Sequence, residues 1–173
     1  MTEKAYLFNG ESADILRDWW KGLEEDRGER AVLRRAPRPT DVVFSPAYHR
    51  LLNHLRGKDY HVNREALAAV AGLLARVTDD TGNNKTFAEE MASPRSKDTD
   101  GARVKDLRFR RLLTVTVRDE LYPMLIRVVR LLDNRVNLIS MADSVYWWNE
   151  NTRKEWAYDY YATAPQKKNK KGG

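Results

Sequence analysis

Apolar residues recur every three or four positions through most of the chain, which is the spacing of helices with one buried face. The clearest case follows Asn63, where REALAAVAGLLARV places Leu67, Val70 and Leu74 on one side. Asn63 itself is suited to cap that helix, because asparagine accepts hydrogen bonds from the free N–H groups of a first turn. Alternation of period two is nearly absent. The pattern therefore predicts an all-α fold.

Start and stop signals divide the rest of the chain into further helices. Ser45 followed by Pro46 predicts a helix start, and Gly57 a stop. Asn137 and Asn151 are predicted to cap two C-terminal helices, while Pro37 and Pro39 argue against helix in their neighbourhood. The predicted helices span residues 12–25, with Ser12 as the cap, then 46–56, 64–77, 86–91, 102–115, a helix from about 119, 138–148 and 152–162.

A polar stretch interrupts this series and predicts how the chain is organised. Residues 78–101 are rich in Gly, Asn, Asp, Ser and Thr, which favour turns. We expect two small, bundle-like helical lobes, residues 1–80 and 102–162, joined by a polar connection over 81–101 with one short helix. Residues 163–173 are expected to form a disordered basic tail.

Large side chains near the C-terminus allow two interpretations. Three Trp and four Tyr lie between Tyr146 and Tyr161. Such a group can form a platform on which bases stack, but it more often closes the core of a small domain. In the preceding helix we expect Val104, Leu107 and Leu112 to face the core, with Leu113 beside them.

Charge is unevenly distributed along the chain. The net charge is +6, yet residues 1–33 sum to −3, whereas residues 102–135 carry nine Arg and Lys against four Asp and Glu. A basic segment that also has an apolar helical stripe presents one face to the core and one to an anionic partner. A solvated helix face would show the same pattern, so charge alone leaves both interpretations open.

The sequence offers little for catalysis. It contains no cysteine, which removes disulfides and thiolate metal ligands and fits a reducing, cytoplasmic setting. His49, His54 and His61 do not share one helical face, and the paired acids of the polar stretches lack a third carboxylate. No apolar run is long enough to span a bilayer. We expect a binding protein without enzymatic activity, cofactor or metal.

Five segments in this order resemble the CasB-type small subunit of the type I-E CRISPR surveillance complex called Cascade. They are LRRA from Leu33, SPAYHRLL from Ser45, KTFAEEM from Lys85, RVKDLRFRRLLT from Arg103, and VNLISMADSVYWWNENTRKEWAYDYY from Val136. The resemblance implies an all-α, non-catalytic subunit present in two copies. Its partners would be the backbone and large subunits, guide RNA and target DNA. Its basic surface would hold the target and displaced strands of the R-loop.

Ten residues form the predicted nucleic-acid-binding set. Those carried over from the resemblance are Arg34, Arg35, Lys85, Arg103, Arg108 and Arg111. Lys105 and Arg110 share the surface of the same basic helix, and helix-face reasoning adds Arg127 and Arg130. The alternative is a structural adaptor whose basic face contacts protein or guide RNA only.

Overall fold

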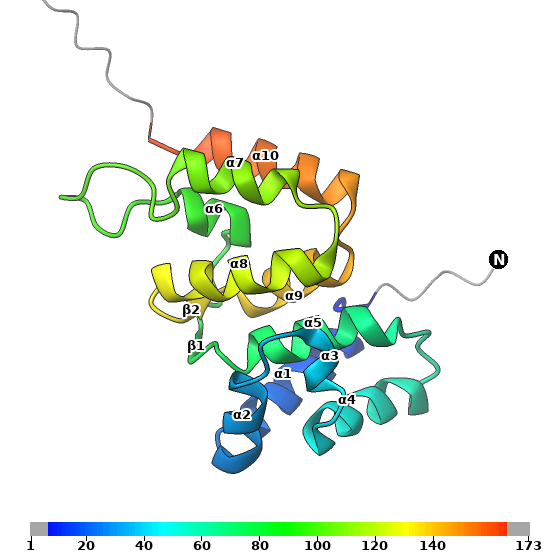
Figure 1. Ribbon diagram of the computed structural model, residues 1–173. Coiled ribbons are helices and arrows are strands. Elements are labelled where there is room, and N and C mark those ends of the chain that lie inside the picture. Colours follow the sequence, from blue (N-terminus) through cyan, green and yellow to red (C-terminus); the bar gives the residue numbers. More distant parts are fainter. Residues whose placement is uncertain (1–6, 166–173) are drawn as a thin grey trace, which may run out of the picture.

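The computed structural model describes residues 7–165, in which ten helices and two very short strands form an all-α fold (Figure 1). The predicted fold class is confirmed. The first half of the chain forms α1 (Glu11–Gly22), α2 (Arg27–Arg34), α3 (Pro39–Val42), α4 (Pro46–Gly57) and α5 (Arg64–Leu74). The second half forms α6 (Phe87–Ala92), α7 (Asp106–Thr114), α8 (Arg118–Leu131), α9 (Leu138–Tyr146) and α10 (Glu150–Thr163). No helix in the described range is long and apolar enough to cross a membrane.

Side-chain caps fix where several helices begin. The Asn63 side chain accepts the Ala66 N–H at 3.0 Å, and Asn137 accepts that of Ser140 at 3.2 Å, so both predicted caps are confirmed. Helix α4 begins at Pro46 and ends at Gly57, as predicted. The cap of α10 was predicted two residues too late: Asn149, not Asn151, accepts the Thr152 N–H at 2.9 Å.

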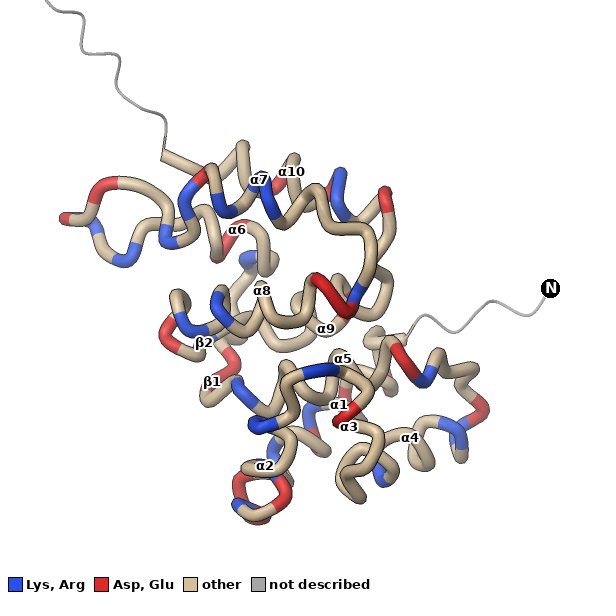
Figure 2. The backbone as a smooth tube through the Cα atoms, in the orientation of Figure 1, with Lys and Arg blue, Asp and Glu red and all other residues tan. Residues whose placement is uncertain are grey.

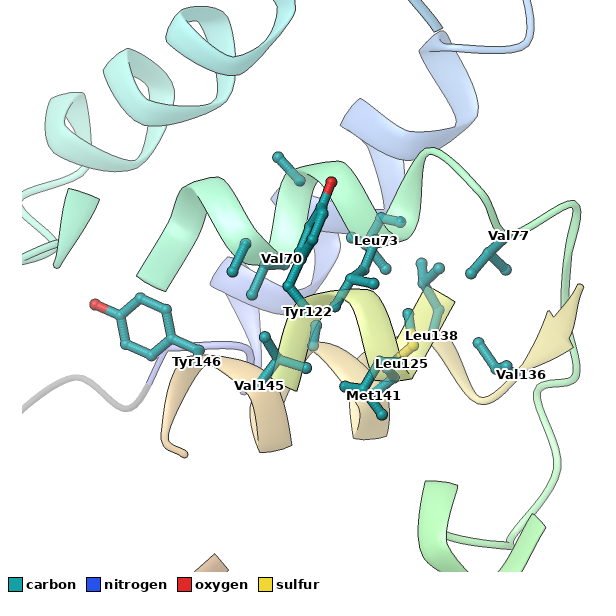
Figure 3. Close-up of a cluster of buried hydrophobic side chains, with 14 of the residues drawn as sticks. Val70, Leu73, Val77, Tyr122, Leu125, Val136, Leu138, Met141, Val145 and Tyr146 are labelled. Atoms are coloured by element: carbon teal, nitrogen blue, oxygen red, sulfur yellow. The ribbon is translucent and has the colours of Figure 1, made fainter. Parts of the chain in front are cut away.

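Helix α5 lies at the centre of the fold. Every residue from Ala66 to Leu74 is buried, because the helix packs against α2, α3 and α4 on one side and α8 and α9 on the other. Figure 3 shows the junction, where Val70 and Leu73 of α5 meet Leu125 of α8 and Met141 of α9. Helices α6, α7 and α10 pack at the far end of the molecule (Figure 1).

Three local predictions differ from the structure. Ser12 does not cap α1; the helix begins at Glu11, and the Ser12 hydroxyl accepts the N–H of Phe8 at 2.7 Å. The proline-rich segment contains the short helix α3, because Pro39 occupies a first-turn position where a missing N–H costs nothing. Strands β1 (Asp79–Asp80) and β2 (Arg135–Val136) pair in parallel over two residues, too few to leave an alternating pattern.

The basic helix also begins later than predicted and buries a different residue. Helix α7 starts at Asp106, because residues 102–105 form a bent, non-helical segment beside α6, in which the Val104 N–H donates to the Met91 carbonyl at 2.9 Å. Leu107, expected in the core, is 58% exposed, whereas Phe109 is fully buried. Phe109 occupies the core position because its ring stacks on Tyr160 of α10, with centroids 3.8 Å apart.

Four of the seven C-terminal aromatic side chains, including two Trp, are buried in the core, whereas Tyr158 and Tyr161 are exposed. Trp148, Trp156 and Tyr160 are buried, and each satisfies its polar atom internally. The indole of Trp148 donates to the Val115 carbonyl at 2.9 Å, and the Tyr160 hydroxyl donates to the Val104 carbonyl at 2.7 Å. These three rings are packed in the core and are therefore not available for stacking on bases.

Candidate nucleic-acid interface

Helix α7 presents basic side chains because two apolar residues hold its other face. Phe109 and Leu112 are completely buried, which fixes the rotation of the helix. Arg108 and Arg111 consequently point to solvent, one turn apart on the exposed face, and are neighbours there. Figure 2 shows Lys and Arg positions running along α7 at the surface. Helix α7 thus holds the backbone of Arg108 and Arg111 in place while their guanidinium groups face solvent.

Arg110, on the same helix, is already occupied. Its Nε lies 3.0 Å from Oδ2 of Asp106, and the Tyr161 hydroxyl donates to Oδ1 of the same carboxylate at 2.6 Å. This cluster joins α7 to α10 and offsets the charge of Arg110. Among the described residues, no acidic side chain forms an ion pair with Lys105, Arg108 or Arg111. Arg108 and Arg111 are thus cations of the helix without an ion-pair partner in the described structure, and so is Lys105 at its N-cap.

Helix α8 carries the second part of the predicted set. Arg127 and Arg130 are exposed in its C-terminal half, while Asp119 and Glu120 occupy its first turn. Helix α8 lies between α7 and the N-terminal helices (Figures 1 and 2). The acidic first turn limits the basic surface of α8 to the second half of the helix.

The third part lies at the end of α2. Arg34 and Arg35 are exposed, and the backbone beneath them is held by a residue that the sequence did not single out. The Arg76 guanidinium donates to the carbonyls of Arg34 at 2.8 Å and Ala36 at 2.9 Å, and to the Tyr122 hydroxyl at 2.9 Å. Arg76 therefore ties the segment after α2 to both α5 and α8.

Lys85 and Arg103 lie apart from these helices, at a pocket of about 280 Å³ beside α6. Lys85 donates from Nζ to the Ser93 hydroxyl at 3.1 Å, and the Arg103 N–H donates to the Ser93 carbonyl at 3.1 Å. Arg135 also lines the pocket and was not predicted. The structure thus arranges the ten predicted residues on three helical surfaces and one pocket.

Several other arginines have structural rather than surface roles. Arg30 donates to the carbonyls of Ala75 and Val77, and Arg118 donates from Nε to the Val145 carbonyl at 2.9 Å. Burial lowers the pKa of both Arg30 and Arg118. Their hydrogen-bond partners are backbone carbonyls, and these contacts become visible only in the fold.

The sequence of the chain matches the model of a known protein family. The family model for CRISPR-associated protein Cse2 matches residues 29–161. A search of curated proteins gave no match.

Two solved structures share the fold. A chain in the crystal structure of E. coli Cascade bound to a PAM-containing dsDNA target has a TM-score of 0.69 and 18% identity, covering 88% of this chain and 95% of that one. CasB from Thermus thermophilus has a TM-score of 0.65 and 23% identity, covering 88% and 99%. Since the family model spans most of the sequence, this chain belongs to the family of CRISPR-associated Cse2 proteins.

Proposed function

We propose that the protein is a non-catalytic subunit of a cytoplasmic, RNA-guided Cascade complex. Its partners would be the other Cascade subunits, the guide RNA, target DNA and a second copy of itself. Its role would be to hold the target and displaced strands of the R-loop through its basic surface. Family membership supports the assembly, and the chain of similar fold in E. coli belongs to a Cascade bound to target DNA.

The arrangement of α7 is the observation that carries the nucleic-acid part of this proposal. Arg108 and Arg111 project from a helix whose rotation is locked by Phe109 and Leu112. Fixed cations without acidic partners suit the phosphate backbone, which carries no sequence information. Guide pairing reads the sequence in such complexes, so a surface that is blind to sequence is the appropriate support.

The energetics of strand exchange explain why such a support matters. Forming the RNA–DNA hybrid is nearly balanced against opening the DNA duplex. A few protein–phosphate contacts are therefore enough to shift the equilibrium towards the open state. Removing the subunit from the assembled complex should increase the rate at which the R-loop closes. Unchanged closing would contradict the proposed role.

A structural adaptor is the second candidate, and exposed apolar residues favour it. Leu107 is 58% exposed on the basic face of α7, and Phe44 is 86% exposed between α3 and α4. Apolar groups of this kind suit a protein contact better than a phosphate.

Photocrosslinking from α7 separates the two functions. A photoreactive residue replacing Lys105, in a complex containing labelled displaced strand and labelled target strand, should capture DNA. An adaptor would give crosslinks to protein or guide RNA only.

A further inference from the structure

The pocket beside α6 brings together cations from three separate segments. Lys85 comes from the connection before α6, Arg103 from the bent segment before α7, and Arg135 from β2. Basic residues so far apart in sequence converge on one hollow only because β1–β2 pairing and the backbone bond from Arg103 to Ser93 bring these segments together.

The charges around the pocket are unequally compensated. Arg135 pairs with Asp79 at 2.8 Å, and Asp133, which also lines the pocket, pairs with Arg95 at 3.3 Å. By contrast, no acidic group within the described part of the chain forms an ion pair with Lys85 or Arg103. Two positive charges at the pocket therefore remain uncompensated.

The remaining acid in the lining, Glu90, makes a hydrogen bond within the protein. Its side chain is buried and accepts the Asn137 N–H, and burial raises its pKa. The Glu90 carboxylate is thus already engaged by the protein backbone.

Arg103, in the lining of this pocket, has a hydrogen-bond donor without an acceptor. Its Nε is buried without a partner in the described structure, and its Nη2 has only a long contact of 3.5 Å to the Arg95 carbonyl. A guanidinium is costly to leave unsatisfied and is matched in geometry to oxyanions. The Ser93 hydroxyl and the side chain of Asn83 add polar groups to the same lining.

We infer that this pocket is a seat for a single phosphate group, bound jointly by Lys85 and Arg103, with Arg135 at its edge. The inference rests on the proposed function, because a nucleic-acid strand would supply the phosphate. It goes further in joining two residues into one site: they would act on one phosphodiester rather than as independent contacts. The strand would be anchored at this point and steered along α7 and α8.

Nitrogen-15 NMR of the full chain tests the seat directly. The Arg103 Nε–H signal is followed while either inorganic phosphate or an oligothymidine of twelve nucleotides is added. We expect the oligothymidine to shift this signal strongly and phosphate to shift it weakly. Lys85→Gln should abolish the shift, whereas Lys97→Gln, an exposed lysine outside the pocket lining, should preserve it.

The outcomes separate failure of the seat from failure of the proposed function. A shift with phosphate but not with the oligothymidine would overturn the strand as ligand. Shifts at Arg108 without any at Arg103 would overturn the seat and leave nucleic-acid binding intact. No shift at either arginine would contradict both.

Salt dependence tests whether the two residues share one phosphate. For single strands, the logarithm of affinity falls with the logarithm of salt by about 0.7 per phosphate neutralised. Lys85→Gln combined with Arg103→Gln should therefore reduce this slope by about 0.7, the value for one phosphate. A reduction near 1.4 would mean two independent contacts and would overturn the shared seat.

Discussion

At the scale of single residues, the arginines divide into two kinds by what their guanidinium groups meet. Arg76 and Arg118 donate to backbone carbonyls and hold the fold together, whereas Arg108 and Arg111 face solvent without acidic partners among the described residues. A sequence shows that an arginine is charged but not which atoms accept the hydrogen bonds of its guanidinium group. For this reason the sequence could not show that Arg76 holds the backbone, or that Arg110 of the predicted set forms an ion pair with Asp106.

Arg76→Met should destabilise the protein. The change removes hydrogen bonds to the carbonyls of Gly72, Arg34 and Ala36, and hydrogen bonds from a charged donor each contribute about 1.5–3 kcal/mol. Because their free energies are not additive and water can reach this half-buried site, we expect a total loss of about 2–3 kcal/mol. Urea unfolding measures it, with Arg35→Met as the control. Equal stability of the two variants would show that the hydrogen bonds of Arg76 do not stabilise the fold.

Glu90 should make stability depend on pH. Burial raises its pKa above that of an exposed glutamate, about 4.3, although hydrogen bonds oppose the shift. The folded protein therefore keeps this proton to higher pH than the unfolded chain does. Its contribution to stability is fully present below the ordinary pKa and is lost as pH rises through the folded value.

The variant Glu90→Gln tests whether stability falls with rising pH because of Glu90. Glutamine cannot ionise but can still accept the Asn137 N–H. We expect its unfolding free energy, measured in urea from about pH 4 to pH 7, to fall less with rising pH than that of the unmodified protein. Glu155→Gln, at an exposed position, should leave the pH dependence unchanged. The same slope for Glu90→Gln and the unmodified protein would refute the assignment.

At the scale of elements, most helices were predictable because their signals are local. Asn63, Asn137 and the Ser45–Pro46 pair set helix starts through short-range hydrogen bonds or fixed backbone geometry. Leu107 and Phe109 show the limit of such reasoning. Both positions are apolar, and the stacking of Phe109 on Tyr160, about fifty residues away in sequence, decides which is buried.

Gly72 illustrates how closely α5 and α8 approach. A Cβ atom at this position would lie 2.3 Å from the Tyr122 hydroxyl and 2.9 Å from Cγ2 of Val42. Gly72→Ala should therefore destabilise the protein by about 1–3 kcal/mol, even though alanine favours helix. Gly22→Ala, where a Cβ meets nothing within 4 Å, should be neutral or stabilising in the same thermal unfolding experiment. A neutral Gly72→Ala would show that α8 can move away.

At the scale of the whole molecule, the sequence predicted the fold class and the family, but not how the parts pack. The hydrophobic core is continuous from α1 to α10, and α5 joins residues of both predicted lobes. The contacts that create the phosphate pocket cross from β1 to β2 and from Ser93 to Arg103. Each depends on tertiary geometry, so the resemblance could indicate Lys85 and Arg103 without showing that they line the same pocket. The predicted tail beyond residue 165 lies outside the described residues.

The central claim is that the basic surface stabilises the opened DNA, and the most direct measurement is the lifetime of an R-loop in the assembled complex. Arg108→Glu with Arg111→Glu should shorten it by about tenfold or more at roughly 0.15 M salt, because two phosphate contacts become repulsive. Lys21→Glu with Arg56→Glu, exposed cations of α1 and α4, makes the same change in charge and should leave the lifetime unaltered. Equal lifetimes for both double variants and the unmodified complex, with folding intact, would contradict the account.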